Sequence, residues 1–524
     1  MTRTIAESEP GVRIHLTKGT AMTTITSTAP PTITANVWPN IINGREIGGG
    51  GEEVLRQSPA HDIRVASYHS AGEADVNAAV GAAHQAFDSG DWPQASGAER
   101  AALLRRVAAR IEDELDELAL IETLESGKPI SQAKDEVSSA AGIWYYAASL
   151  AQHAYGDAHN HLGPNYLAVT VKEPVGVVAV ITPWNFPLLI VSQKLPFALA
   201  VGCTVVVKPS DLTPGTTTRL VQILHDEGMP DGVVNLVHGG GDVGGWLSNH
   251  PGTHMTTFTG STAVGRMVAQ AAAKDLKKVS LELGGKNPQV IFPDADLDAA
   301  LEKVVFGAYF NQGECCNAGS RLLVHADIAD EFTERVVGRA QDVAVGDPLD
   351  PVTKVGALIS EKHLGVVSGY VDLGQAEGAS VAIGGNRLDS DRGRYYSPTV
   401  LAGVPKTARV AREEIFGPVL SVVRFADLAE AVEITNATGY GLSAGVWSRD
   451  IDTALGYAQA TKAGTVWINC YMDGFPEISF GGYGASGLGR ELGRTAIDEY
   501  IEHKSTIIRT GAQAPSWVGG VGEK

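Results

Sequence analysis

Residues 177–183, with the sequence VVAVITP, decide the fold class of this chain. Five apolar residues in a row, ended by a Thr-Pro pair, are typical of a short strand that is buried on both faces. Similar apolar runs follow at 204–207, 232–237 and 254–258, and helical stretches such as 216–227 lie between them. Buried strands that alternate with helices indicate a parallel sheet with helices on both sides. The sequence therefore predicts an α/β fold built on a parallel sheet.

The carboxyl ends of these strands are the expected ligand-binding edge. Ligands of open parallel sheets bind where the strands end, in the crevice above the sheet. Three segments stand at such ends: 182–186, 208–211 and 259–261. We expect them to lie close together in space and to contribute to one site.

Outside this sheet the chain has three further regions. A helix is expected at about 97–124, because an S-x-x-E capping box precedes apolar residues at helical spacing. A second α/β region begins near residue 282, so we place a domain boundary near 281. Its strand–helix–strand stretches are 320–345 and 419–446. Residues 1–36 are rich in Thr, Ser and Pro and are expected to form a disordered arm.

The composition restricts the classes of function. The 524 residues carry 41 basic and 60 acidic side chains, a net charge of −19, which disfavours nucleic acid and anionic membranes as partners. The four cysteines are too few for a disulfide scaffold and lack metal-ligand spacing, so we expect no metal. No apolar run resembles a secretory signal or a membrane span. We therefore expect a cytoplasmic protein with reduced thiols.

Two glycine-containing turns are candidates for binding a phosphate group. Residues 239–244 fit the pattern G-x-G-x-x-G after a strand, but the acidic residue expected about twenty positions later is missing. Residues 258–265, FTGSTAVG, follow a strand and open a helix, whose free N–H groups attract phosphate oxygens. We favour the second segment; the alternative is an ordinary strand-to-helix turn.

Three residues are candidates for catalysis. Cys316 lies in the polar, Gly-rich loop 311–319, NQGECCNAG, which can present a thiolate to a pocket, although a buried cysteine is more often structural. Glu282 stands in an apolar strand, where desolvation would make it a general base; the alternative is a salt bridge to Lys286. Asn185 stands two residues after one proline and two before another, and its amide could donate to an oxyanion or simply cap a turn.

These segments occur in a recognisable order along the chain. The further members of the set are Lys208-Pro209-Ser210, residues 414–418 (EIFGP) and residues 481–493, which include SGLGRE. In this order of motifs the chain closely resembles the aldehyde dehydrogenase superfamily over roughly residues 37–510. The resemblance implies a non-acylating, NAD(P)⁺-dependent enzyme that oxidises an aldehyde to a carboxylic acid.

The resemblance also implies a role for each motif. Cys316 is expected to form a thiohemiacetal and then a thioester, Asn185 to form the oxyanion hole with the Cys316 backbone N–H, and Glu282 to activate water. NAD⁺ is the expected cofactor, and NADP⁺ stays open as the alternative. The expected cofactor contacts are Lys208 at the adenosine ribose, Ser261 at the pyrophosphate, Glu414 at the nicotinamide ribose, Phe416 near the nicotinamide ring, and Trp184, Gly260 and Gly265 beside them.

A domain plan and an assembly follow from the same resemblance. We expect a Rossmann-type dinucleotide-binding domain at 37–152 and 175–281, a catalytic domain at 282–499, and a β element for oligomerisation at 153–174 and 500–511. Homodimers or homotetramers are expected. Two rival functions are a CoA-acylating dehydrogenase, against which the presence of Glu282 argues, and a non-catalytic dinucleotide-binding relative, which should have lost the nucleophile or the base.

Two positions depart from the family pattern near the cofactor and the interface. Asp211 stands where relatives often have glutamate, and the shorter carboxylate would clash less with a 2′-phosphate. We favour NAD⁺ because no arginine stands nearby in the sequence to pair with such a phosphate. Gly484 replaces a frequent lysine, so any role of that lysine is in doubt here.

Two further departures concern the expected substrate tunnel. Gln193 and Gly474 replace frequent aromatic residues, and Asp473 and Glu477 lie in the same loop as Gly474. We hypothesise a roomier and more polar pocket, suited to a small amino- or hydroxy-aldehyde of the betaine aldehyde type. The alternative is that both carboxylates simply face water.

Overall fold

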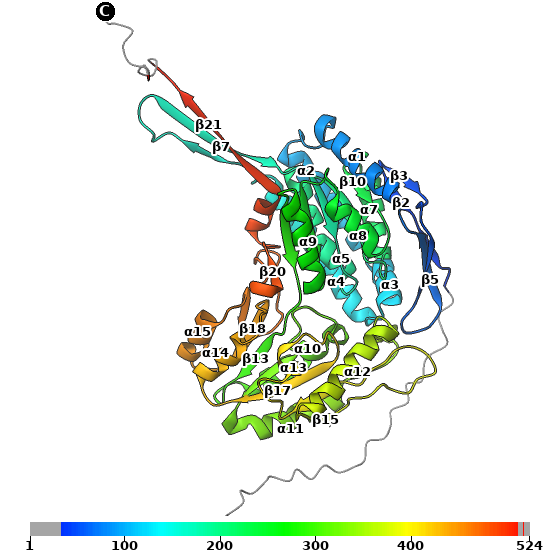
Figure 1. Ribbon diagram of the computed structural model, residues 1–524, viewed down its shortest axis with the longest axis vertical. Coiled ribbons are helices and arrows are strands. Elements are labelled where there is room, and N and C mark those ends of the chain that lie inside the picture. The colour runs from blue at the N-terminus through cyan, green and yellow to red at the C-terminus, as the bar shows by residue number, and fades with distance from the viewer. Residues whose placement is uncertain (1–32, 512–516, 518–524) are drawn as a thin grey trace, which may run out of the picture.

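The computed structural model describes residues 33–511 and Trp517. The arm expected at 1–36 therefore lies almost entirely outside the described residues. Within the described ranges, no helix combines the length and the apolar character that crossing a membrane requires. Four β-sheets, two of them large, organise this part of the chain (Figure 1).

The predicted strands form the centre of the first large sheet. β8 (Val177–Ile181), β9 (Thr204–Lys208), β10 (Val234–Leu236) and β11 (Met255–Thr259) run parallel to one another, which confirms the expected strands and the α/β fold class. The complete order is β20-β12-β11-β8-β9-β10-β2-β3. Its other strands are β2 (Asn40–Ile42), β3 (Arg45–Ile47), β12 (Lys278–Glu282) and β20 (Gly487–Leu488).

Both faces of this sheet are buried, because successive side chains of a strand point to opposite sides. Val178 and Val180 of β8 belong to one apolar core, whereas Val177 and Ala179 belong to another. The first core includes residues of α2, α4, α5, α6 and α7, and the second those of α1, α8 and α9. The bounds are α1 (Glu73–Ser89), α4 (Ile130–Ala151), α5 (Pro187–Ser192), α6 (Leu195–Val201), α7 (Gly215–Asp226), α8 (Gly241–Asn249) and α9 (Thr262–Lys274).

The single helix expected at 97–124 is in fact two helices, α2 (Gly97–Asp113) and α3 (Leu115–Ser126). The predicted capping box does open α2. The prediction of one helix was wrong because Glu114 leaves the helical conformation between α2 and α3. Its carboxylate accepts hydrogen bonds from Arg110 and from Arg219, and the second contact is too distant in sequence for local periodicity to predict.

The second large sheet has the order β15-β16-β17-β14-β13-β18-β19 and is parallel except for the edge strand β15. The stretch expected at 419–446 is confirmed as β17, α14 and β18. The stretch at 320–345 is confirmed as β14 and α11, but Val345 makes only an isolated bridge. The strands are β13 (Pro288–Ile291), β14 (Arg321–His325), β15 (Ser380–Ile383), β16 (Thr399–Ala402), β17 (Val419–Phe425), β18 (Ser443–Trp447) and β19 (Thr465–Ile468). The helices are α10 (Leu297–Tyr309), α11 (Ala329–Gln341), α12 (Glu361–Ala376), α13 (Arg409–Arg412), α14 (Leu428–Asn436) and α15 (Ile451–Ala460).

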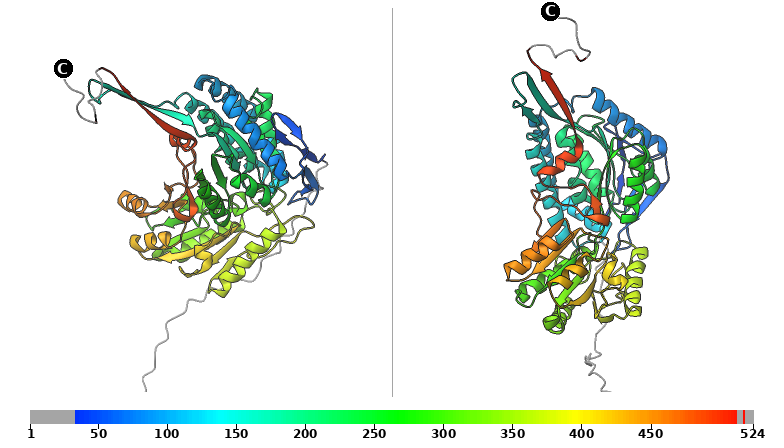
Figure 2. Two further views of the ribbon diagram at one scale, coloured as in Figure 1. Left: turned by 45° about the horizontal axis from the view of Figure 1, so that its top comes forward. Right: turned by 60° about the vertical axis from the view of Figure 1, so that its left-hand side comes forward.

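Two small sheets complete the described part. β6 (Asp157–His159), β7 (Tyr166–Pro174) and β21 (Ile501–Arg509) form an antiparallel sheet from the two segments that we expected to mediate oligomerisation. Figure 2 shows from two sides that this sheet projects from the body of the molecule as an arm. The other sheet joins β1 (Asn36–Trp38), β5 (Arg64–His69) and β4 (Glu53–Gln57).

A short connection joins the carboxyl ends of the strands of the first large sheet to the amino ends of those of the second. Glu282 ends β12 at the carboxyl edge of the first sheet, and Pro288 begins β13 at the amino edge of the second, so only residues 283–287 separate them. After the second sheet, β20 returns to pair with β12, although it falls inside the range 282–499 that we assigned to the catalytic domain. The candidate residues of the sequence lie at this junction.

Candidate active site

Cys316 lies in a rigid loop at the junction of the two sheets. The loop starts with the 3-10 turn Phe310–Gly313, in which Asn311 and Gln312 have φ values of 50° and 59°. Such left-handed values are uncommon outside glycine and need compensating contacts. The Asn311 amide supplies them by donating to the carbonyl oxygens of Asn185, at 3.1 Å, and Glu314, at 2.9 Å. The shape of the loop is thereby fixed relative to the end of β8.

Asn185 and Glu282 lie beside this loop. Asn185 Nδ2 donates to the Glu314 carbonyl oxygen at 3.1 Å, and because a side-chain amide has two N–H groups, one stays available for another acceptor. Asn185, Glu282 and Cys316 all line one cavity of about 250 Å³. The structure therefore brings together the three candidates that the sequence singled out from segments more than 30 residues apart.

The Glu282 carboxyl is buried and has no hydrogen-bond partner among the described residues. Burial raises its pKa well above the usual value, and the carboxylate of Glu491 adds to this effect, whereas Lys194 opposes it. The alternative of a salt bridge to Lys286 is wrong, since the Lys286 ammonium has no hydrogen-bond partner either. A carboxyl without a partner can accept a proton from a small molecule in the cavity.

Lys194 and Glu491 form a buried ion pair behind Glu282, which our sequence analysis did not identify. Lys194 is fully buried and Glu491 is 2% exposed, and the ammonium also donates to Thr257 Oγ1 at 3.1 Å. The only indication in the sequence was two charged residues next to apolar ones, which is too common to be informative. The pair places a positive charge where it favours the ionised form of Glu282.

The Cys316 thiol is held in its neutral form by its surroundings. A hydrogen bond with the Cys315 side chain raises its pKa most, followed by burial and by the nearby carboxyls of Glu414 and Glu282. The Cys315 thiol itself donates to Asn317 Oδ1 at 2.8 Å. A thiol in this state is a poor nucleophile until a base removes its proton.

Three cavities meet around these groups and form one continuous site. The cavity of about 250 Å³ shares Thr259, Glu282 and Cys316 with a second cavity of about 390 Å³. It shares Trp184, Gly260 and Ser261 with a third cavity, of about 670 Å³, on the far side. Cys316 and Glu282 thus stand between a large cavity on the first sheet and another at the surface.

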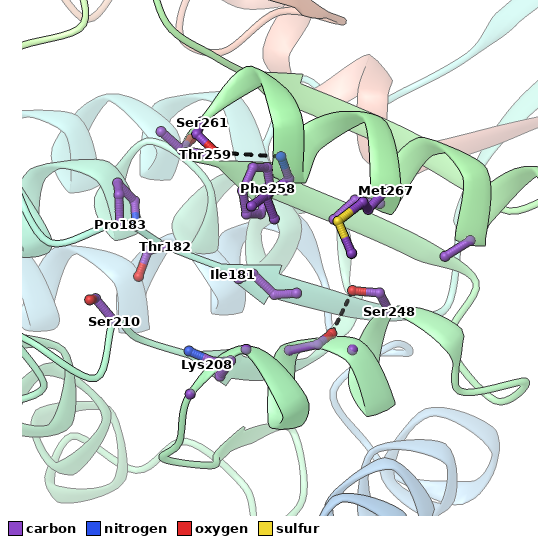
Figure 3. A pocket seen from close by; sticks show the side chains of 18 of the residues that line it. Ile181, Thr182, Pro183, Lys208, Ser210, Ser248, Phe258, Thr259, Ser261 and Met267 are labelled. Atoms are coloured by element: carbon purple, nitrogen blue, oxygen red, sulfur yellow. Dashed lines mark hydrogen bonds between the residues drawn. The ribbon is translucent and has the colours of Figure 1, made fainter. Parts of the chain in front are cut away.

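The 670 Å³ cavity lies at the carboxyl edge of the first sheet, between α8 and α9 (Figure 3). Lys208 at the end of β9 has its pKa lowered by burial to about 8, and its Nζ donates to the Pro209 carbonyl. Ser261 caps α9 by accepting from Val264 N–H at 3.4 Å, so the N–H groups of the first helical turn face this cavity. A volume of this size, with apolar walls and a few polar groups, fits a dinucleotide.

The glycine segment that we had set aside lies on the same cavity. Gly240, Gly241, Gly244 and Gly245, in and before α8, all line it. Both candidate segments therefore line one cavity, because the helix that follows β10 faces the helix that follows β11. Gly265 does not line any of the three cavities; a Cβ atom there would lie 2.4 Å from Leu283 Cδ2, so this glycine permits close packing.

Glu414 and Phe416 form the wall of the middle cavity opposite Ser261. Glu414 Oε1 accepts from Gly285 N–H at 3.0 Å, and burial raises the Glu414 pKa to about 7. Phe416 has a φ of 60° and its carbonyl oxygen lies 2.6 Å from His363 Nε2, which must therefore carry the proton. His363 and Trp184 also contact the Phe416 ring edge-on. His363 is a second positioning residue that the sequence did not indicate.

The surface cavity contains two of the departures from the family pattern. Gln193 and Gly474 line it, together with one face of α4. Asp473 and Glu477 do not line it; both are exposed, and Asp473 forms an ion pair with Lys303 at 2.8 Å. We had expected Asp473 and Glu477 to make this cavity polar, and they do not line it. Gly484 has a φ of 58°, a conformation that disfavours the lysine frequent at this position.

Comparison with known proteins places this site in context. Residues 48–506 match the family described as the aldehyde dehydrogenase family. Betaine aldehyde dehydrogenase of Bacillus subtilis is 39% identical over 481 residues, which cover 91% of this chain and 98% of that protein. The structure of an NAD-dependent aldehyde dehydrogenase from Sinorhizobium meliloti superposes with a TM-score of 0.92 at 46% identity, covering 94% and 99% of the two chains. Betaine aldehyde dehydrogenase from Staphylococcus aureus, solved in complex with NAD⁺, gives a TM-score of 0.90 at 36% identity, covering 92% and 96%.

The geometry predicts which residue discriminates between dinucleotides with and without a 2′-phosphate. Asp211 lines the 670 Å³ cavity beside Lys208, and its carboxylate would repel that phosphate, while Lys208 and Lys274 are the cations of the lining. We expect Asp211→Ser to lower the KM for NADP⁺ roughly tenfold, about 1.4 kcal/mol, and to change the KM for NAD⁺ far less. Steady-state kinetics with both cofactors provide the measurement, and a parallel change in both KM values would contradict the assignment.

Proposed function

The chain belongs to the aldehyde dehydrogenase family, and we propose that it oxidises its aldehyde through a thioester on Cys316. The observation that carries this proposal is that Cys316 and Glu282 line both the middle cavity and the surface cavity. An aldehyde that enters from the surface would therefore meet the thiol and the base together, next to the dinucleotide cleft. NAD⁺ is the cofactor, and when bound it accepts the hydride that leaves the former aldehyde carbon.

Each protein group has a defined part in this reaction. The Cys316 thiol first loses its proton to solvent. The thiolate sulfur then attacks the aldehyde carbon, and the free N–H of Asn185 Nδ2, with the Cys316 backbone N–H, stabilises the oxygen that becomes negative. Loss of hydride leaves an acyl group on the Cys316 sulfur. Glu282 then takes a proton from a water molecule, whose oxygen attacks the thioester carbon and releases the carboxylic acid and the free thiol.

Lys208, Ser261 and Glu414 are the proposed cofactor-binding residues. Trp184 and Gly260 line both the dinucleotide cavity and the middle cavity, where they would separate the pyrophosphate from the nicotinamide. Met267, which is 66% exposed on α9, offers an apolar surface beside the cavity for the adenine ring. Phe416, held by His363, would pack against the nicotinamide. Gly265 contributes by close packing of α9 on Leu283.

The substrate class follows from the charges around the surface cavity. One face of α4 supplies Asp135, Glu136 and Ser139, and Glu282 and Glu491 line the cavity as well. Glu136 is ion-paired with Lys128 and Glu491 with Lys194, so the exposed Asp135 is the carboxylate that is left to attract a cation. None of the residues that line this cavity, all of them within the described ranges, is a lysine or arginine. Aromatic side chains complete the wall: Phe186, Phe310, Trp467, Phe475 and Phe480. Acidic and aromatic groups together attract organic cations, so we propose a small amino- or trimethylammonium-aldehyde of the betaine aldehyde type.

The arm formed by β6, β7 and β21 is the proposed interface of a homodimer or homotetramer. β21 is an edge strand, and nearly all of its residues are exposed. Ile507 is 70% exposed and Ile508 is 42% exposed, and β7 adds exposed Tyr166, Leu167 and Val171. A long, exposed edge strand that carries exposed apolar side chains is a site for pairing with another chain.

The first prediction from the proposed function concerns its two chemical steps. Glu282→Gln should release one equivalent of NADH in a burst and then stall, because the acyl-enzyme forms but water is not activated. Cys316→Ala should show no burst, and Cys315→Ala is the matched control that should retain it. Stopped-flow absorbance at 340 nm measures the burst. Normal turnover by Glu282→Gln would contradict the role of Glu282, and acyl-CoA formation on adding CoA would support the rival acylating enzyme.

A second prediction concerns pH. The Cys316 thiol and the Glu282 carboxyl both have raised pKa values and must both lose a proton, so kcat/KM should rise with pH beyond about 8.5, the usual thiol value. Cys315→Ala removes the largest cause of the raised thiol pKa and should move this rise to lower pH. Cys470 does not line the cavities, so Cys470→Ala is the control. An identical profile for all three proteins would refute the coupling between the two thiols.

A third prediction tests the cationic substrate. Asp135 is exposed at the surface cavity, so Asp135→Asn should raise the KM for a trimethylammonium-aldehyde two- to fivefold, the effect of about 0.5–1 kcal/mol for an exposed charge pair. The uncharged aldehyde with a tert-butyl group in place of trimethylammonium should be unaffected. Glu117→Gln removes an equal charge from an exposed side chain that does not line the cavity and serves as the control. Equal KM changes for both aldehydes would reject the proposal.

A fourth prediction tests the interface. Ile507→Asp places a charge in the exposed apolar edge strand and should shift the assembly toward monomers in light scattering after size-exclusion chromatography. Val366→Asp, at a side chain that is 45% exposed on α12, is the matched control and should leave the molar mass unchanged. A wild-type protein that is already monomeric at micromolar concentration would overturn the proposal.

A further inference from the structure

A small cavity lies in the second sheet, apart from the three that form the active site. It sits where β13, β14 and β18 begin, beside the ends of α14 and α15. The volume of the cavity is about 10 Å³, which is enough for one water molecule or one monatomic ion. Its lining comprises Lys286, Asn287, Pro288, Arg321, Thr435, Thr438, Tyr440, Gly441, Leu442, Ser443, Lys462 and Ala463.

Two buried cations of this lining have unused hydrogen-bond donors. Lys286 is 2% exposed, and its ammonium has no hydrogen-bond partner within residues 33–511. Arg321 is also 2% exposed; its two terminal nitrogens donate to the carbonyl oxygens of Ile434 and Thr435, but its Nε has no partner there. A buried cation without a partner is costly, because it loses hydration that nothing replaces.

The rest of the lining does not neutralise these charges. Lys462 adds a third cation, and no acidic residue is among the described residues of the lining. The Ser443 hydroxyl is buried and has no partner either. The Lys286 pKa is lowered to about 7, first by burial and then by the charge of Arg321, while Glu414 and Glu413 oppose this effect. The Glu414 carboxylate accepts from Gly285 N–H and lines the middle cavity instead.

We propose that this cavity binds a single monovalent anion, a halide ion such as chloride, between Lys286 and Arg321. The donors and positive charges of the lining select an anion over a cation, and the volume excludes polyatomic ions such as phosphate or sulfate. The ion takes no part in the oxidation of aldehydes. It acts as a counter-ion that keeps two like charges together at the start of the second sheet.

The position of the cavity connects the anion to the nucleophile loop. Asn287, which lines the cavity, donates from its amide to the carbonyl oxygens of Cys316, at 2.8 Å, and Ala318, at 3.0 Å. The anion is therefore a structural element next to the residues that hold the loop. Binding only to the folded protein stabilises it by an amount that grows with the anion concentration.

Bromide is the probe for the test, because its anomalous scattering identifies it in a crystal. Crystals of the full-length protein grown or soaked in bromide should show an anomalous peak in contact with Lys286 Nζ and Arg321 Nε. In solution, Tm should rise and saturate as bromide replaces gluconate at constant ionic strength. Lys286→Met should abolish both effects. Lys277→Met, which removes a half-buried lysine with three hydrogen-bonded oxygens elsewhere, should retain both.

Two results would overturn the proposal. One is a cavity without anomalous density in wild-type crystals that bind bromide elsewhere, which would identify its occupant as water. The other is a bromide-dependent rise in Tm that is equal in wild type and Lys286→Met. Should Lys286→Met fail to fold, the anomalous map of the wild-type crystal decides alone. None of these outcomes depends on the catalytic roles proposed for Cys316 and Glu282.

Discussion

The short connection between β12 and β13 is the constraint on which the rest of this structure depends. Residues 283–287 join the carboxyl edge of one parallel sheet to the amino edge of another, so the two edges must face each other at close range. Ligands bind at the carboxyl edge of such a sheet, and the second sheet supplies the nucleophile loop just before β14. β20 follows the second sheet in the chain and pairs with β12 of the first, which forms a second connection between the two sheets.

Burial of charged groups at this junction gives the site its chemical character. Glu282, Glu414 and Cys316 all have raised pKa values, with burial as the main cause for both carboxyls and the second cause for the thiol. Behind Glu282, the Glu491 carboxylate raises the Glu282 pKa further and the Lys194 ammonium lowers it, so the two members of this buried ion pair act on Glu282 in opposite directions. Burial also leaves two cations at the start of the second sheet, Lys286 and Arg321, with hydrogen-bond donors that have no partner among the described residues.

The surface cavity has its position and its charge set by different parts of the fold. Its position is set by the junction, but its charge comes from α4, a helix whose opposite face packs in the core. Because residues at i, i+3, i+4 and i+7 share a helix face, Gln132, Asp135, Glu136 and Ser139 all reach the cavity. A change at the exposed Asp135 can alter the charge of the cavity, whereas Gln132 is constrained because its side-chain oxygen accepts from Asn311 N–H of the Cys316 loop at 2.9 Å.

The sequence by itself predicted the four central strands of the first sheet, the edge where ligands are expected to bind and the three residues that meet at the junction. These follow from local patterns: continuous apolar runs, turn residues at their ends, and motifs in a fixed order. Only the tertiary structure decided that Glu114 divides a helix, that Glu282 is without a partner rather than bound to Lys286, and that the glycines before α8 face the same cavity as Ser261. It also showed that the acidic groups at the surface cavity come from α4 rather than from Asp473 and Glu477. The physical reason is that each of these facts depends on contacts between residues far apart in the chain, whereas periodicity and motifs report only what neighbours in sequence can do.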